Sequence, residues 1–143
     1  MYNNVRNWHR FVPGGNIFSL EKFVVPINIG NGHWTCAVIH MNAKKVAYYD
    51  SLNGRGKKYM KALFNYVKEE WRRIHNTELP CSDEWSMTTV ACPHQRNGYD
   101  CGVFVCFYAR CLRMGLPMSL TQRDINDYGR QYIGMSILRG ILL

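Results

Sequence analysis

Cys101 stands in a setting that is typical of a cysteine nucleophile. It follows a loop that contains Gly98 and Asp100, and the apolar run of residues 101–109 predicts that it occupies the first turn of a helix. Unpaired N–H groups and the dipole at a helix start favour a thiolate, and the same N–H groups could hold a developing oxyanion. The carboxylate of Asp100 would oppose thiolate formation, unless it caps the helix and turns its charge onto backbone amides. By itself this segment fits a reactive thiol or a buried structural cysteine.

A thiol nucleophile needs a base within hydrogen-bond reach, and His33 is the candidate with the most suitable position. It lies between a glycine-rich loop over residues 30–32 and a predicted strand, where a rigid edge can hold a catalytic side chain. Asp50 ends the next predicted strand, and antiparallel pairing of the two strands would bring its carboxylate beside His33 to fix the imidazole tautomer. Gln95, six residues before Cys101, can donate its amide N–H to an oxyanion. This ordered set of His, Asp, Gln and Cys predicts nucleophilic catalysis.

The predicted elements place these residues at the ends of strands and helices. Strands are predicted over residues 23–27, 34–41, 45–49 and 87–92, with a hairpin turn over 41–44. Helices are predicted over residues 57–76 and 100–113, and a last helix begins near Thr121 with Asp124 in a capping-box arrangement. Pro26, in the first strand, favours a sheet edge or a strand end. This order of strands and helices predicts an α+β fold.

Two of the predicted helices carry an apolar face at helical spacing. In the first helix the face comprises Met60, Leu63, Phe64, Val67, Trp71 and Ile74. In the last helix it comprises Ile125, Tyr128, Tyr132 and Met135. We expect both faces to be buried.

The composition favours one globular domain over residues 1–143. Of the 143 residues 47% are hydrophobic, which suffices for a core. Eighteen Lys and Arg against ten Asp and Glu give a net charge of +8, which attracts nucleic acid, anionic membranes or acidic proteins. The aromatic residues mostly fall on predicted core faces, and the sequence has neither a span of ~20 apolar residues nor a signal peptide. We therefore expect no nucleic acid and no membrane as partner, although the charge by itself does not choose among these polyanions.

The six cysteines do not form a metal-binding pattern. They contain no C-x-x-C pair, and their spacings match no zinc template. The sequence therefore predicts no metal site and no cofactor. The cysteines other than Cys101 are expected to be reduced and mostly buried as small hydrophobic residues.

Three segments together resemble one protease family. The first runs from Val25-Pro26-Ile27-Asn28-Ile29 to His33-Trp34, the second is Tyr48-Tyr49-Asp50-Ser51, and the third is Gln95-Arg96-Asn97-Gly98-Tyr99-Asp100-Cys101-Gly102. These segments closely resemble the ULP/SENP family of SUMO-specific cysteine proteases, and the resemblance extends from about Phe18 to Leu143. It implies a papain-like α+β fold with a rearranged catalytic order (His-Asp-Gln-Cys). In that fold a mixed sheet packs on a central helix that carries the cysteine.

The resemblance also implies a role for each matching residue. Cys101 would be the nucleophile, His33 the general base and acid, and Asp50 the residue that orients the imidazole. Gln95 would line the oxyanion hole together with the backbone N–H of Cys101. Trp34 would bind substrate, because it matches a tryptophan that closes a narrow tunnel over a Gly-Gly tail. Only residues without side chains fit such a tunnel, so its shape would select Gly-Gly.

The family implies an activity and a partner. It predicts a peptidase and isopeptidase that cleaves after the C-terminal Gly-Gly of SUMO, in precursors and in lysine conjugates, and that acts as a monomer in the nucleus or cytoplasm. The family domain usually begins further upstream, so residues 1–143 are expected to be a single catalytic domain without its N-terminal part. Two alternatives stay open: a protease for another ubiquitin-like modifier such as NEDD8 or ubiquitin, and a truncated, inactive module that binds such a modifier.

Overall fold

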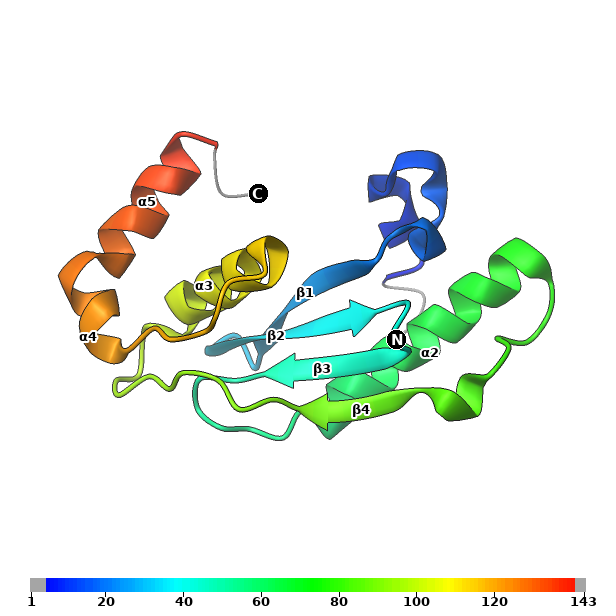
Figure 1. Cartoon of the computed structure of the whole chain (residues 1–143), viewed down its shortest axis with the longest axis horizontal. Helices are drawn as coiled ribbons and strands as arrows, with labels where there is room; N and C mark the ends of the chain where they lie inside the picture. Colours follow the sequence, from blue (N-terminus) through cyan, green and yellow to red (C-terminus); the bar gives the residue numbers. More distant parts are fainter. Residues whose placement is uncertain (1–4, 141–143) are drawn as a thin grey trace. The chain divides into compact units, whose positions relative to one another are not determined.

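The computed structural model describes residues 5–140, in which four strands form one sheet. The strands are β1 (Lys22–Ile29), β2 (His33–His40), β3 (Lys45–Tyr49) and β4 (Ser86–Thr89), and they lie in this order across the sheet. β2 and β3 run in opposite directions (Figure 1), whereas β3 and β4 are parallel, with Val46 opposite Met87. The sheet is therefore mixed, and together with the helices it confirms the predicted α+β class.

The strands follow the sequence pattern closely. β2 is buried over five consecutive residues, as expected for a central strand, and Pro26 lies on β1 at the edge of the sheet. The turn over residues 41–44 joins β2 to β3. β4 ends at Thr89, three residues before the predicted end. Beyond it the chain approaches the segment after β3, where the Gln95 backbone N–H donates to the Ser51 carbonyl at 3.1 Å.

The described residues form two compact units, and each unit is assembled from separate stretches of the sequence. The first contains the residues up to Val25, Ala37–Tyr48 and Gly56–Thr89; the second contains Pro26–Cys36, Tyr49–Arg55 and the residues from Val90 onward. All five candidate site residues belong to the second unit. Within residues 5–140, no helix combines the length and the apolar character that crossing a membrane requires.

The first unit is organised around α2 (Lys57–His75). Four short 3₁₀ segments accompany it: η1 (Trp8–Phe11), η2 (Pro13–Gly15), η3 (Ile17–Ser19) and η4 (Ser82–Glu84). Aromatic rings join α2 to these and neighbouring segments, with 5.6 Å between the ring centroids of Trp8 and Tyr66 and 5.3 Å between those of Phe64 and Trp85. These ring contacts hold the neighbouring segments against α2, whereas Phe11 of η1 is 88% exposed.

The buried face of α2 differs from the predicted face at its C-terminal half. Met60, Leu63 and Val67 are buried as expected. Glu70 is also fully buried, although a carboxylate is rarely placed in a core. It accepts two hydrogen bonds from the Arg73 guanidinium, at 3.0 and 2.8 Å, and lies 3.6 Å from the His9 Nδ1. Phe64, Trp71 and Ile74 are only partly buried, so their predicted full burial is wrong. An ion pair occupies part of the inner face instead, at a position outside the predicted apolar spacing.

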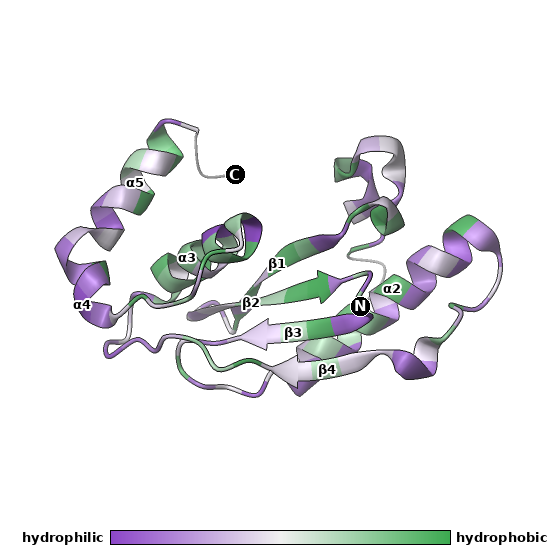
Figure 2. Cartoon of the chain, viewed as in Figure 1, coloured by the Kyte–Doolittle hydropathy of each residue, from purple (hydrophilic) through white to green (hydrophobic). Residues whose placement is uncertain are grey.

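The second unit contains α3 and a long C-terminal helical run. α3 spans Cys101–Met114, and the run comprises α4 (Gln122–Asp124), η5 (Ile125–Gly129) and α5 (Arg130–Leu138). α3 is buried along one side and contacts the end of β3, with 6.0 Å between the ring centroids of Tyr108 and Tyr49. Figure 2 shows apolar residues on α3, whereas α4 is mostly hydrophilic. The predicted capping box of Thr121 and Asp124 closes the start of α4 and is confirmed.

The inner face of the last helix is shifted by one residue from the predicted face. η5 is a π-helical turn, which holds an extra residue compared with an α-helical turn. Beyond Ile125 the buried positions are Gly129, Ile133 and Ser136, each one residue later than predicted. Tyr128, Tyr132 and Met135 are between 41% and 53% exposed, so their predicted burial is wrong.

Candidate active site

The Cys101 side chain lies at the first residue of α3. The residue is 5% exposed, and the first helical hydrogen bond runs from the Phe104 N–H to the Asp100 carbonyl at 3.0 Å. No side chain caps this helix start. The amide groups of the first turn therefore have no side-chain cap, and a helix N-terminus in this state can offer them to an anion.

His33 and Asp50 meet at the ends of β2 and β3. The His33 Nε2 is 2.7 Å from the Asp50 Oδ1, and Asp50 is 5% exposed. The same Oδ1 accepts the Leu52 backbone N–H at 2.8 Å, which fixes the carboxylate against its own turn. Because the ring uses Nε2 toward Asp50, the tautomer that donates there leaves Nδ1 as an acceptor.

Gln95 is held by three hydrogen bonds before α3 begins. Its Oε1 accepts the Ser51 hydroxyl at 2.6 Å, its Nε2 donates to the Asn97 carbonyl at 2.5 Å, and its backbone N–H donates to the Ser51 carbonyl at 3.1 Å. The side chain is buried, so its orientation is well defined. A primary amide has two N–H groups, and one of them is sufficient for the bond to Asn97.

Trp34 lies beside the first turn of α3. A methyl group added at Gly102 would lie 3.8 Å from the Trp34 Cδ1, and the tryptophan is 43% exposed. Its indole therefore adjoins the residue that follows Cys101, with a large part of its surface open to a ligand. Because residue 102 is glycine, no side chain stands between its backbone and the Trp34 indole.

Asp100 occupies the N-cap position of α3, but its carboxylate does not cap the helix, which corrects the capping hypothesis. Its φ and ψ are −91° and 3°, outside the extended region that capping residues usually adopt. The carboxylate instead accepts the Arg130 Nε and Nη2 at 2.8 and 2.7 Å. It also accepts the amides of Asn97 at 2.7 Å and Gln122 at 2.8 Å. Its charge is thus compensated by side chains.

Arg130 and Gln122 are the two residues near this site that the sequence patterns did not reveal. They lie 30 and 22 residues after Asp100, on another helix, and no local spacing connects them to it. No signal in the local sequence marks Arg130, because its side chain is 42% exposed and its contact with Asp100 joins segments thirty residues apart.

The interactions of Asp100 predict a loss of stability in acid. The hydrogen bond from Arg130, followed by those from Asn97 and Gln122, lowers the pKa of Asp100 from 3.8 to about 2. The ionised Asp100 carboxylate therefore stabilises the fold at pH values above the pKa that Asp100 has in the unfolded chain. This contribution is lost as the pH falls from about 4 toward 2. We expect the urea midpoint to fall over this range and to fall less in an Asp100→Asn variant. Equal falls in both proteins would contradict the prediction.

Three of the other cysteines are unsuited to act as nucleophiles. Burial raises the pKa of Cys36 to about 12, and burial also raises the pKa of the Cys106 and Cys111 thiols. Each therefore stays protonated at neutral pH. Among residues 5–140, no three His, Cys, Asp or Glu side chains gather in a way that could hold a metal ion.

Comparison with known proteins identifies a family over nearly the whole chain. Residues 1–139 match the Ulp1 protease family, C-terminal catalytic domain. The chain is 32% identical over 134 residues to Sentrin-specific protease 2 of Mus musculus, covering 92% of this chain and 22% of that protein. It is 36% identical over 140 residues to Ubiquitin-like-specific protease 1A of Arabidopsis thaliana, covering 96% of this chain and 27% of that protein. The chain thus spans about a quarter of these relatives.

Solved structures agree with the sequence comparison. The C-terminal Ulp1 protease domain, solved in complex with Smt3, the yeast ortholog of SUMO, superposes with a TM-score of 0.80 at 30% identity. That match covers 99% of this chain and 62% of the solved one. The SUMO protease Ulp1 with its catalytic cysteine oxidised to a sulfonic acid also gives a TM-score of 0.80, at 29% identity over 99% of this chain and 63% of that chain. The chain therefore belongs to the Ulp1 protease family and corresponds to its C-terminal catalytic domain.

Proposed function

We propose that this chain is a cysteine peptidase and isopeptidase that cleaves after the C-terminal Gly-Gly of SUMO, in precursors and in lysine conjugates. The observation that carries the proposal is the pairing of His33 with buried Asp50 at 2.7 Å, in the same compact unit as Cys101 at the start of α3. The similar structures of the SUMO protease Ulp1, and of the Ulp1 domain in complex with Smt3, the yeast ortholog of SUMO, supply the substrate class. The proposal treats residues 1–143 as one catalytic domain.

In the first half of the proposed reaction, the Cys101 thiolate attacks the carbonyl carbon of the terminal glycine. A C–S bond forms, and the carbonyl π electrons move to the oxygen. The Gln95 side-chain amide and the N–H groups at the start of α3 donate hydrogen bonds to this oxyanion. When the carbonyl re-forms, the C–N bond breaks, and the protonated His33 gives its proton to the departing lysine amine.

In the second half, water hydrolyses the thioester. His33, now neutral, takes a proton from the attacking water, and the second tetrahedral intermediate releases the Cys101 thiolate. Asp50 accepts the Nε2–H of His33 throughout, so that Nδ1 faces the reacting atoms and the imidazolium is stabilised. The carboxyl end of SUMO leaves with a free Gly-Gly terminus.

Substrate selection in this proposal combines shape and charge. The exposed face of Trp34 forms one wall along which a chain without side chains can lie, which favours Gly-Gly before the cleaved bond. The net charge of +8 favours association with an acidic ubiquitin-like protein, more through its rate of encounter than through final affinity. We place this activity in the nucleus or cytoplasm and propose that the enzyme acts as a monomer.

The test is hydrolysis of three fluorogenic substrates that differ only in the modifier: SUMO, ubiquitin or NEDD8, each with aminomethylcoumarin on its last glycine. We expect rapid hydrolysis of the SUMO substrate and at least ~100-fold lower kcat/KM for the other two. Preference for another modifier would keep the chemistry and overturn the substrate. A folded chain that binds SUMO and hydrolyses none of the three would be a binding module, which would overturn the enzymatic proposal.

Gly54 supplies a separate prediction, because it lies against the Asp50 carboxylate. A Cβ at this position would be 2.3 Å from the Asp50 Oδ2, so Gly54→Ala has to displace the carboxylate or the turn that carries it. We expect kcat for the SUMO substrate to fall by roughly tenfold with little change in KM, because the hydrogen bond to His33 is misaligned. Gly134→Ala is the matched control, since a Cβ there meets no atom within 4 Å. A Gly54→Ala enzyme with unchanged kcat would count against the proposed role of Asp50.

A further inference from the structure

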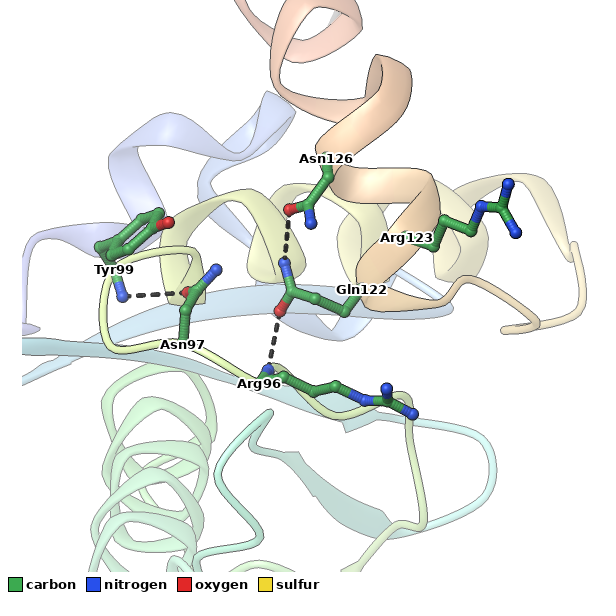
Figure 3. A pocket seen from close by; sticks show the side chains of 6 residues that line it. All are labelled: Arg96, Asn97, Tyr99, Gln122, Arg123 and Asn126. Atoms are coloured by element: carbon green, nitrogen blue, oxygen red, sulfur yellow. Dashed lines mark hydrogen bonds between the residues drawn. The ribbon is translucent and has the colours of Figure 1, made fainter.

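The loop that precedes Cys101 is tied to the C-terminal helical run by one hydrogen-bond network. Figure 3 shows Gln122 between the two segments: its Oε1 accepts the Arg96 backbone N–H at 2.8 Å, and its Nε2 donates to the Asn126 Oδ1 at 3.1 Å. These residues line a pocket of about 380 Å³ together with Asn97, Tyr99 and Arg123. The loop is therefore anchored to a helix that lies more than twenty residues later in the sequence.

The Asp100 carboxylate is the centre of this network. It is 2% exposed and receives four side-chain hydrogen bonds: the Nε and Nη2 of Arg130, the Nδ2 of Asn97 and the Nε2 of Gln122. Arg130 is the one positive charge among these donors, and its two bonds form the bidentate pair that a guanidinium makes best. Asn97 in turn accepts the backbone N–H groups of Tyr99 and Asp100 through its Oδ1.

The start of α4 shows how a capping residue is placed in this unit. At Thr121 the backbone is extended, and the side chain accepts the Asp124 N–H, as a capping residue normally does. Asp100 stands at the equivalent position before Cys101, yet its carboxylate is drawn to Arg130 and caps nothing. A carboxylate that did cap α3 would occupy the N–H groups that the proposed reaction needs for its oxyanion. Without Arg130, the Asp100 carboxylate would also lose the guanidinium that balances its charge.

We propose that Arg130 is a positioning residue of the catalytic centre, which holds the Asp100 carboxylate away from the first turn of α3. This inference rests on the proposed function and adds a residue to it. Arg130 acts on Cys101 through Asp100 in two ways: it balances the charge next to the thiolate, and it leaves the first-turn amides open to the oxyanion. The ionisable groups of this arrangement are the pair of His33 and Asp50, the pair of Asp100 and Arg130, and Tyr99, whose ring centroid lies 5.3 Å from the Arg130 guanidinium.

The experiment compares wild type, Arg130→Gln, Arg130→Lys and the double variant Asp100→Asn/Arg130→Gln. Two quantities are measured: kcat and KM for SUMO–aminomethylcoumarin, and the pH profile of iodoacetamide alkylation at Cys101, followed by mass spectrometry of its peptide. For Arg130→Gln we expect kcat to fall by roughly tenfold at nearly constant KM, and the alkylation profile to move upward by about one pH unit. The double variant has no carboxylate at position 100, so its alkylation profile should return to the wild-type position.

Arg130→Lys and a control complete the design. Lysine keeps the positive charge but cannot form the bidentate pair. The alkylation profile of Arg130→Lys should therefore stay within a few tenths of a pH unit of the wild-type profile, and its kcat should fall less than that of Arg130→Gln. The control is Arg123→Gln, which also removes one positive charge from the C-terminal helical run, at a highly exposed side chain. It should leave the kinetic constants and the alkylation profile unchanged. If Arg130→Gln does not fold, the lysine and double variants provide the same comparison.

Each outcome decides for or against the inference. A lower kcat in Arg130→Gln with an unmoved alkylation profile would show a merely structural role and overturn it. So would a double variant whose profile stays shifted, or an Arg130→Gln enzyme with wild-type kcat and profile. The alkylation profile needs no substrate, so a wild-type chain that fails to cleave SUMO would defeat the proposed function and leave the test of Arg130 intact.

Discussion

Replacement of Cys101 by alanine is expected to lower SUMO–aminomethylcoumarin hydrolysis by at least ~10⁴-fold, because no other group can form the thioester. Burial keeps the thiols of Cys36, Cys106 and Cys111 protonated, so they cannot substitute for it. The measurement is single-turnover hydrolysis at high enzyme concentration. A SUMO with an electrophilic vinyl group at its carboxyl end should label the wild type and fail to label Cys101→Ala.

A second cysteine variant shows whether the loss of hydrolysis is specific to Cys101 or follows from replacing any cysteine. Cys81 is exposed and lies in the first unit, so Cys81→Ala should keep wild-type hydrolysis and labelling. Binding of unmodified SUMO should also survive in Cys101→Ala, because the thiol contributes little contact area. Residual hydrolysis above one hundredth of wild type in Cys101→Ala would contradict the assignment of the nucleophile.

Replacement of Asp50 by alanine is expected to lower kcat by about 10²–10⁴-fold, with a much smaller change in KM. The carboxylate is buried and reaches His33 rather than the surface, so its loss affects the orientation and charge of the imidazole more than substrate binding.

Asparagine at position 50 separates hydrogen bonding from charge. Its Oδ1 can still accept from the His33 Nε2 and from the Leu52 N–H, so Asp50→Asn should retain more activity than Asp50→Ala. Asp127→Asn is the control, since Asp127 is an exposed carboxylate of the same unit that pairs only loosely with Arg123, at 3.5 Å. Equal activities for the alanine and asparagine variants of Asp50 would show that the hydrogen bond contributes nothing.

The fold class and the elements that bear the site follow from the sequence, because their signals are local. β3 was predicted at its observed limits, and α3 begins within one residue of its predicted start, since apolar runs and turn residues mark both. The closeness of His33 and Asp50 followed from pairing between neighbouring strands. Their catalytic roles, and those of Gln95 and Trp34, remain proposals until the variants are measured.

The features that the sequence did not reveal depend on contacts between distant segments. Glu70 is buried because Arg73 and His9 compensate its charge, and the apolar pattern of α2 contains no trace of that arrangement. Asp100 fails to cap α3 because Arg130, thirty residues later, competes for its oxygens. Local propensity favours capping at Asp100, and the tertiary ion pair overrides it.

The π-helical turn at Ile125–Gly129 has a consequence for comparing members of the family by alignment. One extra residue rotates everything after it by about 100° around the helix axis. In a relative whose helix lacks this extra residue, the arginine that meets the aspartate should stand one position nearer to the helix start than Arg130 does here. An alignment with such a relative would need a one-residue gap inside the helix, because an alignment without the gap would match side chains that lie on different sides of the helix.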